Sequence, residues 1–141
     1  MTDVDILALT VWAESRGEPV EGQIAVANVI KNRVALGRWG GSFEAVCRAP
    51  MQFSCWNEGT DANHQALLAL ANLVTSGHEP VDPRFAQARW IAAGIASGAL
   101  LDNVRGATYY HVRTMNPFPR WALGQIPCAS LGAHLFYRGI A

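Results

Sequence analysis

Glu14 is the residue whose type and position best suit acid–base chemistry. At about 100° per residue along a helix, it falls on the same side as the apolar Leu7 and Val11. A carboxyl at the inner edge of an apolar face is partly desolvated, which raises its pKa, and the carbonyl-rich end of the helix acts in the same direction. Such a carboxyl keeps a proton near neutral pH and can act as a general acid. The alternative, which position alone favours because lone acids are common near helix ends, is an ordinary carboxylate paired with Arg16 or Arg33.

Helices over most of the chain must position this carboxyl. The first helix is predicted to run from the N-cap Thr2 to about Ser15, and the second from Pro19 to Val34. Two more helices and two strands follow. The two helices are predicted at about 63–76 and from 83 to about 97–98, and the two strands at 107–112 and 131–137.

Length and composition fit one domain over residues 1–141. The chain has a mass of 15.3 kDa, and 50% of its residues are hydrophobic and 16% charged, which is enough apolar surface for a compact core. Because the strands fall only in the C-terminal third, we expect a mainly helical α+β fold with a small β-sheet there. The segment from Arg38 to Thr60 is the least regular, and its length indicates a functional loop.

The charges and apolar stretches argue against several partners. Eleven Lys and Arg balance eleven Asp and Glu, so no global field attracts nucleic acid or a membrane surface. The longest apolar stretch, 66–74, is much shorter than the ~18 residues of a membrane span. The acidic start, Met1 to Asp5, lacks the basic region of a secretory signal. We expect a monomer made in the cytoplasm that reaches its site of action by an outside route.

The cysteines and histidines do not have metal-site spacing. A bridge between Cys47 and Cys55 is conceivable, but buried free thiols are favoured for these two and for Cys128. His111 and His134 could in principle ligate zinc, yet no close-spaced ligand pair accompanies them. We expect no metal and no cofactor.

Four sequence blocks resemble a known family. They are WAESRGEPVEGQIAVANVIKNRV at 12–34, QFS at 52–54 with Trp56, GATYYH at 106–111, and WA at 121–122 with LGAHLFYR at 131–138. In this order they resemble the spore cortex-lytic and cell-wall hydrolase family (SleB/CwlJ type) over nearly the whole chain. One departure is Asp102-Asn103-Val104, which stands where the family usually has a D-P-T-like element.

The resemblance implies a lysozyme-like catalytic fold with peptidoglycan glycan strands as substrate and partner. It implies cleavage between N-acetylmuramic acid and N-acetylglucosamine, with Glu14 at the position of the family's catalytic glutamate. The better-studied members are lytic transglycosylases, which leave a 1,6-anhydro sugar and need only one carboxylate. Without a wall-binding domain or export signal, the chain looks like a phage endolysin that acts on the wall after release.

The resemblance also implies sugar-binding roles for the second block. Gln52 and Ser54 can form hydrogen bonds with sugar hydroxyl or acetamido groups, and Phe53 and Trp56 offer apolar faces to a sugar ring. The alternative is that the two aromatic residues anchor the core, which we favour for Phe53.

The strand block and the remaining acid of the first motif have two interpretations each. Tyr109 and His111 share one face of a strand and are assigned to the groove, while Tyr110 faces the core. Trp121 either stacks on a sugar or packs between helix and sheet. Glu18 is a second carboxylate that supports hydrolysis or orients the substrate, or a helix-capping or supporting residue, which we favour.

Three alternative functions stay open. Lysozyme-type hydrolysis would produce ordinary reducing ends with a second carboxylate. An N-acetylmuramoyl-L-alanine amidase would need a metal or a Cys/His pair, for which Cys55 and His111 are the candidates. A non-catalytic module would bind glycan without cutting it.

Overall fold

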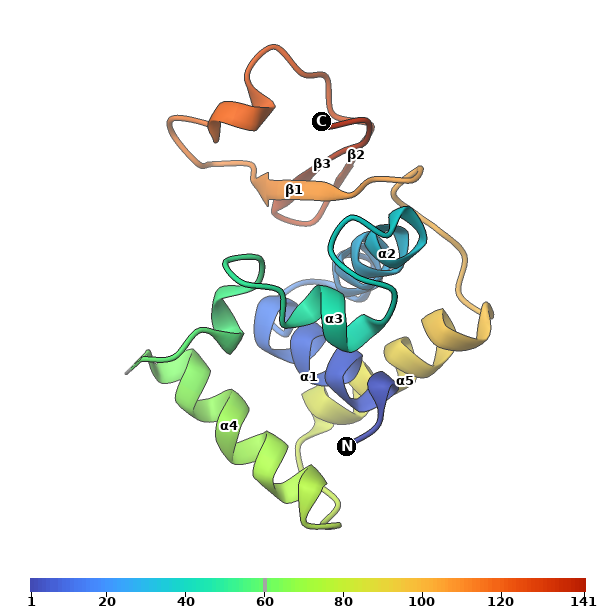
Figure 1. Cartoon of the computed structure of the whole chain (residues 1–141), viewed down its shortest axis with the longest axis vertical. Coiled ribbons are helices and arrows are strands. Elements are labelled where there is room, and N and C mark those ends of the chain that lie inside the picture. Colours follow the sequence, from blue (N-terminus) through green and yellow to red (C-terminus); the bar gives the residue numbers. More distant parts are fainter. Residues whose placement is uncertain (60) are drawn as a thin grey trace.

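The computed structural model describes residues 1–59 and 61–141; Thr60, the last residue of the predicted functional loop, lies outside them. The described residues form five α-helices, two single-turn 3₁₀ helices and a three-stranded sheet (Figure 1). The bounds are α1 Asp3–Ser15, α2 Val20–Leu36, α3 Phe43–Cys47, η1 Ser54–Trp56, α4 Ala62–Thr75, α5 Pro83–Ser97, β1 Tyr109–Val112, η2 Arg120–Ala122, β2 Ala129–Leu131 and β3 His134–Tyr137.

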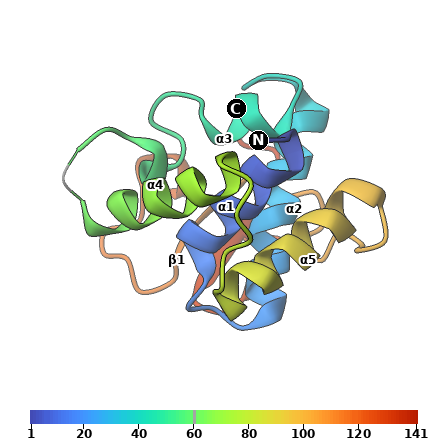
Figure 2. The same ribbon diagram turned by 90° about the horizontal axis from the view of Figure 1, so that it is seen from below.

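Helix α1 is the central element, because it is apolar on nearly every side. Nine of its 13 residues are buried, and it contacts α2, α3, α4 and α5 (Figure 2). Its predicted start is confirmed: the Thr2 hydroxyl accepts the Asp5 N–H at 3.1 Å, and the Asp5 carboxylate accepts the Thr2 N–H at 2.8 Å. Glu14 therefore lies in the last turn of an enclosed helix.

The other predicted helices are confirmed to within one or two residues. Helix α2 begins just after Pro19 and ends at Gly37, whose φ of 79° is left-handed. Helix α5 begins where the Asp82 carboxylate accepts the Arg84 N–H, and it ends at the left-handed Gly98. It packs against both α1 and α2.

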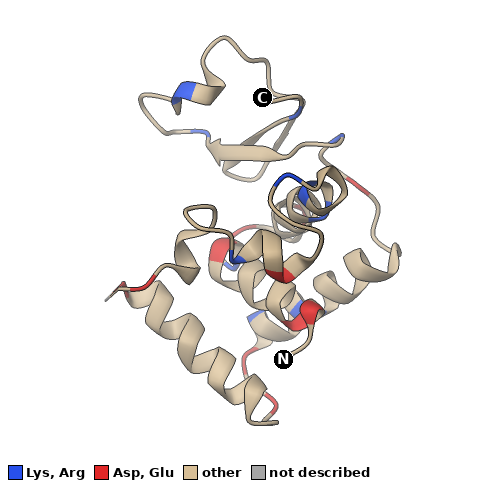
Figure 3. Cartoon of the chain, in the orientation of Figure 1, with Lys and Arg blue, Asp and Glu red and all other residues tan. Residues whose placement is uncertain are grey.

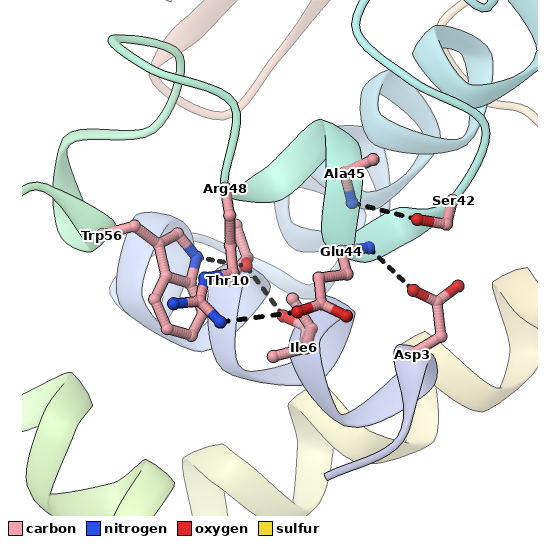
Figure 4. A network of polar contacts seen from close by, with 8 residues as sticks. All are labelled: Asp3, Ile6, Thr10, Ser42, Glu44, Ala45, Arg48 and Trp56. Carbon is pink, nitrogen blue, oxygen red and sulfur yellow. Dashed lines mark hydrogen bonds and ion pairs between the residues drawn. The ribbon is translucent and has the colours of Figure 1, made fainter.

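Helix α3 lies inside the segment predicted to be irregular. The Ser42 hydroxyl accepts the Ala45 N–H at 3.0 Å, which is an ordinary N-cap. The Asp3 carboxylate, from the first turn of α1, accepts the N–H groups of Phe43 and Glu44 at 3.1 and 2.7 Å, and Figure 4 shows the contact with Glu44. This second cap comes from a distant part of the chain, so the short helix is stabilised by a tertiary contact.

The single strand predicted at 131–137 is wrong, because the chain turns there. Strands β2 and β3 are separated by Gly132 and Ala133, with a left-handed φ of 56° at Gly132. Strand β3 pairs antiparallel with β1 on one side and β2 on the other, giving the order β1-β3-β2. The α+β class with a small C-terminal sheet is confirmed.

Helix α2 joins the helical part to the sheet. Its Ala25 and Val29 are fully buried against Val104, Ala107 and Phe136. These five residues form a second core beside the main core around α1. The sheet consequently stands at one end of the molecule, with α2 between it and α1 (Figure 1). Within the described ranges, no helix combines the length and the apolar character that a membrane crossing requires.

Candidate active site

Glu14 is partly buried and has no cationic partner within the part of the chain that the structure describes. Arg16 turns back over the Trp12 ring and donates to the carbonyls of Trp12 and Ala13. Arg33 donates from Nε to the Thr108 carbonyl at 2.7 Å. The alternative of a carboxylate paired with Arg16 or Arg33 is therefore wrong.

Two opposing effects set the proton affinity of Glu14. Burial raises the pKa of its carboxyl, and this is the larger effect. Hydrogen bonds from the thiol and the backbone N–H of Cys55 lower the pKa, because they stabilise the carboxylate. Since burial dominates, Glu14 holds its proton at a higher pH than an ordinary glutamate does.

The first turn of α4 is hydrogen-bonded both to Cys55 and to the residue that precedes Glu14. His64 is buried, and its Nδ1 lies 2.7 Å from the Cys55 carbonyl oxygen; because a carbonyl only accepts, Nδ1 carries the proton. The neighbouring Asn63 donates from Nδ2 to the Ala13 carbonyl at 3.1 Å. Helix α4 is thus bonded to the residue before Glu14 and to Cys55 itself.

All three cysteines are free, as favoured from the sequence. Burial raises the pKa of Cys47 to about 12 and raises that of Cys55 further, so both stay thiols. His111 contacts the Val112 carbonyl through Nδ1 and the Tyr137 hydroxyl through Nε2, at 2.9 and 2.8 Å. The structure does not bring Cys55 and His111 together as a nucleophile and its base.

Tyr110 is the strand residue whose pKa responds to the charge of Glu14. Burial raises its pKa well above the ordinary value, and the nearby Glu14 charge acts in the same direction, whereas Arg33 opposes it. The edge of its ring meets His134, with centroids 5.1 Å apart and an interplanar angle of 89°. The expectation that Tyr110 faces the core is confirmed, because it packs against both cores; its pKa also responds to the Glu14 charge.

Tyr109 and His111, the two residues assigned to the groove, lie on the opposite face of β1. His111 is 6% exposed and packs against Phe118, Trp121 and Tyr137. Tyr109 lies beside Trp121 with ring centroids 5.0 Å apart, and Trp121 is partly buried. These residues form an aromatic cluster that shares the strand, but not the face, with Tyr110. Their sugar-binding roles stay predictions.

The block at 52–56 is largely engaged with the rest of the protein. Gln52 accepts a hydrogen bond from Arg33 at 3.2 Å, and Phe53 is 3% exposed in the main core, as favoured from the sequence. The Trp56 indole donates to the Thr10 hydroxyl at 2.9 Å, and Arg48 lies over its ring (Figure 4). Ser54, by contrast, is exposed at the start of η1.

Glu18 holds the turn between β2 and β3. Its Oε1 accepts the Ala133 N–H at 2.8 Å and lies 2.9 Å from Nδ1 of His134. The capping role is wrong, because the N-cap of α2 is Pro19 and receives no side-chain hydrogen bond. The supporting role agrees with the geometry, since His134 in turn packs against Tyr110.

Three further residues lie around Glu14 and were not assigned to a glycosidase site from the sequence: Cys55, His64 and Tyr110. Arg33 is a buried cation whose guanidinium lies over the rings of Trp39, Phe53 and Tyr109, and burial lowers its pKa. No three His, Cys, Asp or Glu side chains of the described ranges are grouped as a metal site would need. The site is thus a protonatable carboxyl surrounded by neutral donors and aromatic rings.

Comparison with known proteins identifies the class. The model of the cell wall hydrolase family matches residues 17–137. The chain therefore belongs to the cell wall hydrolase family.

The solved structures that it resembles are more specific. The catalytic domain of the Bacillus cereus SleB protein is 26% identical and superimposes with a TM-score of 0.67, over 95% of this chain and 88% of that one. The catalytic domain of the germination-specific lytic transglycosylase SleB from Bacillus anthracis is 27% identical, with a TM-score of 0.65 over 95% and 92% of the two chains.

The curated relatives are named spore cortex-lytic enzyme and are longer than this chain. The spore cortex-lytic enzyme of Bacillus cereus is 32% identical over 99 residues, which are 63% of this chain and 38% of that protein. The enzyme of the same name from Oceanobacillus iheyensis is 36% identical over 76 residues, 50% of this chain and 28% of that protein. The matched part thus spans about a third of these relatives.

Proposed function

We propose that this protein cleaves peptidoglycan glycan strands between N-acetylmuramic acid and N-acetylglucosamine as a lytic transglycosylase, with Glu14 as the general acid. The observation that carries the proposal is a partly buried carboxyl with a raised pKa that forms no ion pair with the described residues. The family match begins at Gly17, so Glu14 lies just before it and its role rests on this geometry.

The proposed reaction needs one carboxyl for two proton transfers. Protonated Glu14 gives its proton to the glycosidic oxygen as the bond from that oxygen to C1 of the muramic acid breaks. The resulting carboxylate then takes the proton of the C6 hydroxyl of the same sugar, and the C6 oxygen bonds to C1. The products are a 1,6-anhydro end and a free hydroxyl, and Glu14 is protonated again. Between the two transfers, the Cys55 donors stabilise the carboxylate.

The position of Glu18 favours this reaction over hydrolysis. A hydrolytic glycosidase generally uses a second carboxylate as nucleophile or base. The Glu18 carboxylate is engaged with the Ala133 N–H and His134, which supports a positioning role instead. The solved Bacillus anthracis relative is itself described as a lytic transglycosylase.

Mass spectrometry of the muropeptides released from purified peptidoglycan tests the proposal. We expect wild type to release 1,6-anhydro-muramoyl ends, lighter than reducing ends by one water. Glu14→Gln should lower the rate by about 10²–10⁴-fold, because a general acid contributes about that much. The matched control is Glu21→Gln, the same change at an exposed position of α2.

Each other outcome contradicts a defined part of the proposal. Reducing ends that disappear in Glu14→Gln would identify a lysozyme-type hydrolase. Free stem peptides with intact glycan would identify an amidase and would exclude Glu14 as a glycosidic acid. Binding to peptidoglycan without any release of product would leave a non-catalytic module.

A further inference from the structure

The charges are segregated along the chain, although their sum is zero. All 11 acidic residues lie at or before Asp102, together with seven of the 11 Lys and Arg. Residues 103–141 carry no acid. Their basic residues are Arg105, Arg113, Arg120 and Arg138. Figure 3 shows the consequence: the sheet and its loops carry blue segments only, whereas the red segments lie in the helical part and the linker before the sheet.

Two of these arginines line a pocket of about 560 Å³ at the sheet end. Arg105 and Arg138 form its charged wall, and Gln125, Ile126 and Cys128 belong to the remaining lining. Arg138 donates from Nη1 to the Arg105 carbonyl at 3.2 Å, which holds the two residues together. No acidic side chain lines the pocket, and neither arginine forms an ion pair within the described part of the chain.

The turn that presents Arg105 is built by Asp102, the acid nearest to it in the sequence. The Asp102 carboxylate accepts the N–H groups of Val104 and Gly106 at 2.7 and 2.8 Å and the Asn32 amide at 3.2 Å. It is thus occupied by neutral donors. The turn also holds Arg105 at a φ of 53°, a left-handed conformation that costs a non-glycine residue free energy. An arginine held there at such a cost points to a function for its side chain.

We infer that this pocket binds a free carboxylate of the peptide stems that peptidoglycan carries on its muramic acid. Guanidinium groups bind carboxylates with paired, charge-assisted hydrogen bonds, and two such groups without an ion-pair partner among the described residues offer an anion site. Ile126 and its neighbour Pro127 add an apolar wall suited to the methyl and methylene groups of a short peptide. The inference rests on the proposed function, because it takes peptidoglycan as the substrate.

Strand β3 connects the pocket to the candidate active site. His134 at its start contacts Glu18 and Tyr110, and Arg138 follows its end. At about 3.3 Å per residue, these two positions are roughly 13 Å apart along the strand. Strand β3 therefore runs from the side chains that pack beside Tyr110 to the edge of the pocket.

Calorimetric titration with a free stem peptide tests the inference without any glycan cleavage. The probes are the tetrapeptide L-Ala–γ-D-Glu–meso-diaminopimelate–D-Ala, the same peptide with its carboxylates amidated, and inorganic phosphate. We expect the tetrapeptide to bind and the amidated form not to bind. Arg105→Gln and Arg138→Gln should each weaken binding at least ~10-fold, because each removes a charge-assisted contact. Arg120→Gln, which changes the net charge equally outside the pocket, is the matched control.

Arg105→Gly separates binding from folding. Glycine adopts a φ of 53° without strain, so this variant should unfold at a higher temperature than wild type and still lose the tetrapeptide. Equal weakening by Arg120→Gln would overturn the inference in favour of a diffuse charge effect. Binding of phosphate but not of the tetrapeptide, or of neither probe, would also overturn it. Because the titration needs no glycan cleavage, none of these results depends on Glu14.

Discussion

At the scale of single residues, the proton on Glu14 depends on Cys55 as well as on burial. A serine hydroxyl is a stronger hydrogen-bond donor than a thiol, so Cys55→Ser should lower the pKa of Glu14. Cys55→Ala removes the side-chain donor and should raise it. A general acid works only while protonated, and activity therefore falls as pH rises through its pKa. The alkaline limb of the pH–rate profile should move to lower pH for Cys55→Ser and to higher pH for Cys55→Ala.

Glu21→Gln is the control for this pair, because Glu21 is exposed on α2. Its profile should match that of wild type. A shift of the serine and alanine variants in the same direction would mean that the thiol does not donate to Glu14.

The sequence predicts Glu14 better than it predicts the residues around it. Helical periodicity is a local property, so the position of Glu14 beside Leu7 and Val11 is visible before folding. Strand alternation separates Tyr110 from Tyr109 and His111 but does not say which face meets α1. Cys55 and His64 approach the acid only through η1 and α4, and no local spacing encodes that contact.

At the scale of elements, the first turn of α4 fixes η1 against α1. Removing the His64 ring leaves the buried Cys55 carbonyl without its partner, which should cost about 1–3 kcal/mol of stability. It should also let the Cys55 donors move, and kcat should fall roughly 10- to 100-fold because small displacements in an active site are costly. We therefore expect His64→Ala to lower kcat with little change in KM.

A stability loss alone would not change the pH dependence, so the alkaline limb of the profile is the second measurement. With the Cys55 donors loosened, the limb should move to higher pH. His64→Asn supplies an amide donor and should restore part of kcat. His78→Ala, at an exposed position after α4, is the matched control. If the limb does not shift and activity falls only in proportion to the amount of folded protein, His64 has a structural role alone.

The turn between β2 and β3 is a second element whose geometry depends on a distant side chain. A Cβ at Gly132 would lie 2.8 Å from Oε1 of Glu18, and the backbone there has a φ of 56°. Gly139 has a similar φ of 70° but nothing within 4 Å of the added Cβ. Gly139→Ala should cost about 1–2 kcal/mol of conformational strain, and Gly132→Ala should cost more. Denaturant unfolding measures both, and equal losses would mean that Glu18 does not constrain the turn.

Elements with local caps could be predicted, and elements with distant caps could not. Thr2 with Asp5, and the glycines at 37 and 98, define helix ends within a few residues of sequence. Helix α3 needs Asp3 from another helix, and the break at Gly132 is held by Glu18. Both errors of the predicted fold therefore fall where the stabilising group is remote.

At the scale of the whole molecule, the fold class follows from where strand-forming residues lie, but the net charge is misleading. A formal charge of zero excludes a global field and says nothing of its distribution. The acids of the helical part and the arginines of the sheet part cancel only in the sum. This separation gives a protein of zero formal charge a cationic end at its sheet.

That carboxyl should also lower the stability of the whole molecule. Its pKa in the folded protein is raised above the ordinary 4.5, so the unfolded chain releases this proton first as pH rises. The contribution of Glu14 to stability is therefore lost from about pH 4.5 upward, until the pH passes its folded pKa.

Glu14→Gln never ionises, and its free energy of unfolding should exceed that of wild type at pH 7 but not at about pH 4. Glu21→Gln, exposed on α2, should show no such pH-dependent difference. An equal difference at both pH values would mean that burial of the charge is not the cause. If the difference in the free energy of unfolding appears only as pH rises, the loss of activity and the gain of stability in Glu14→Gln have one cause, the buried carboxyl. This is the trade-off between activity and stability that is expected of an active-site residue.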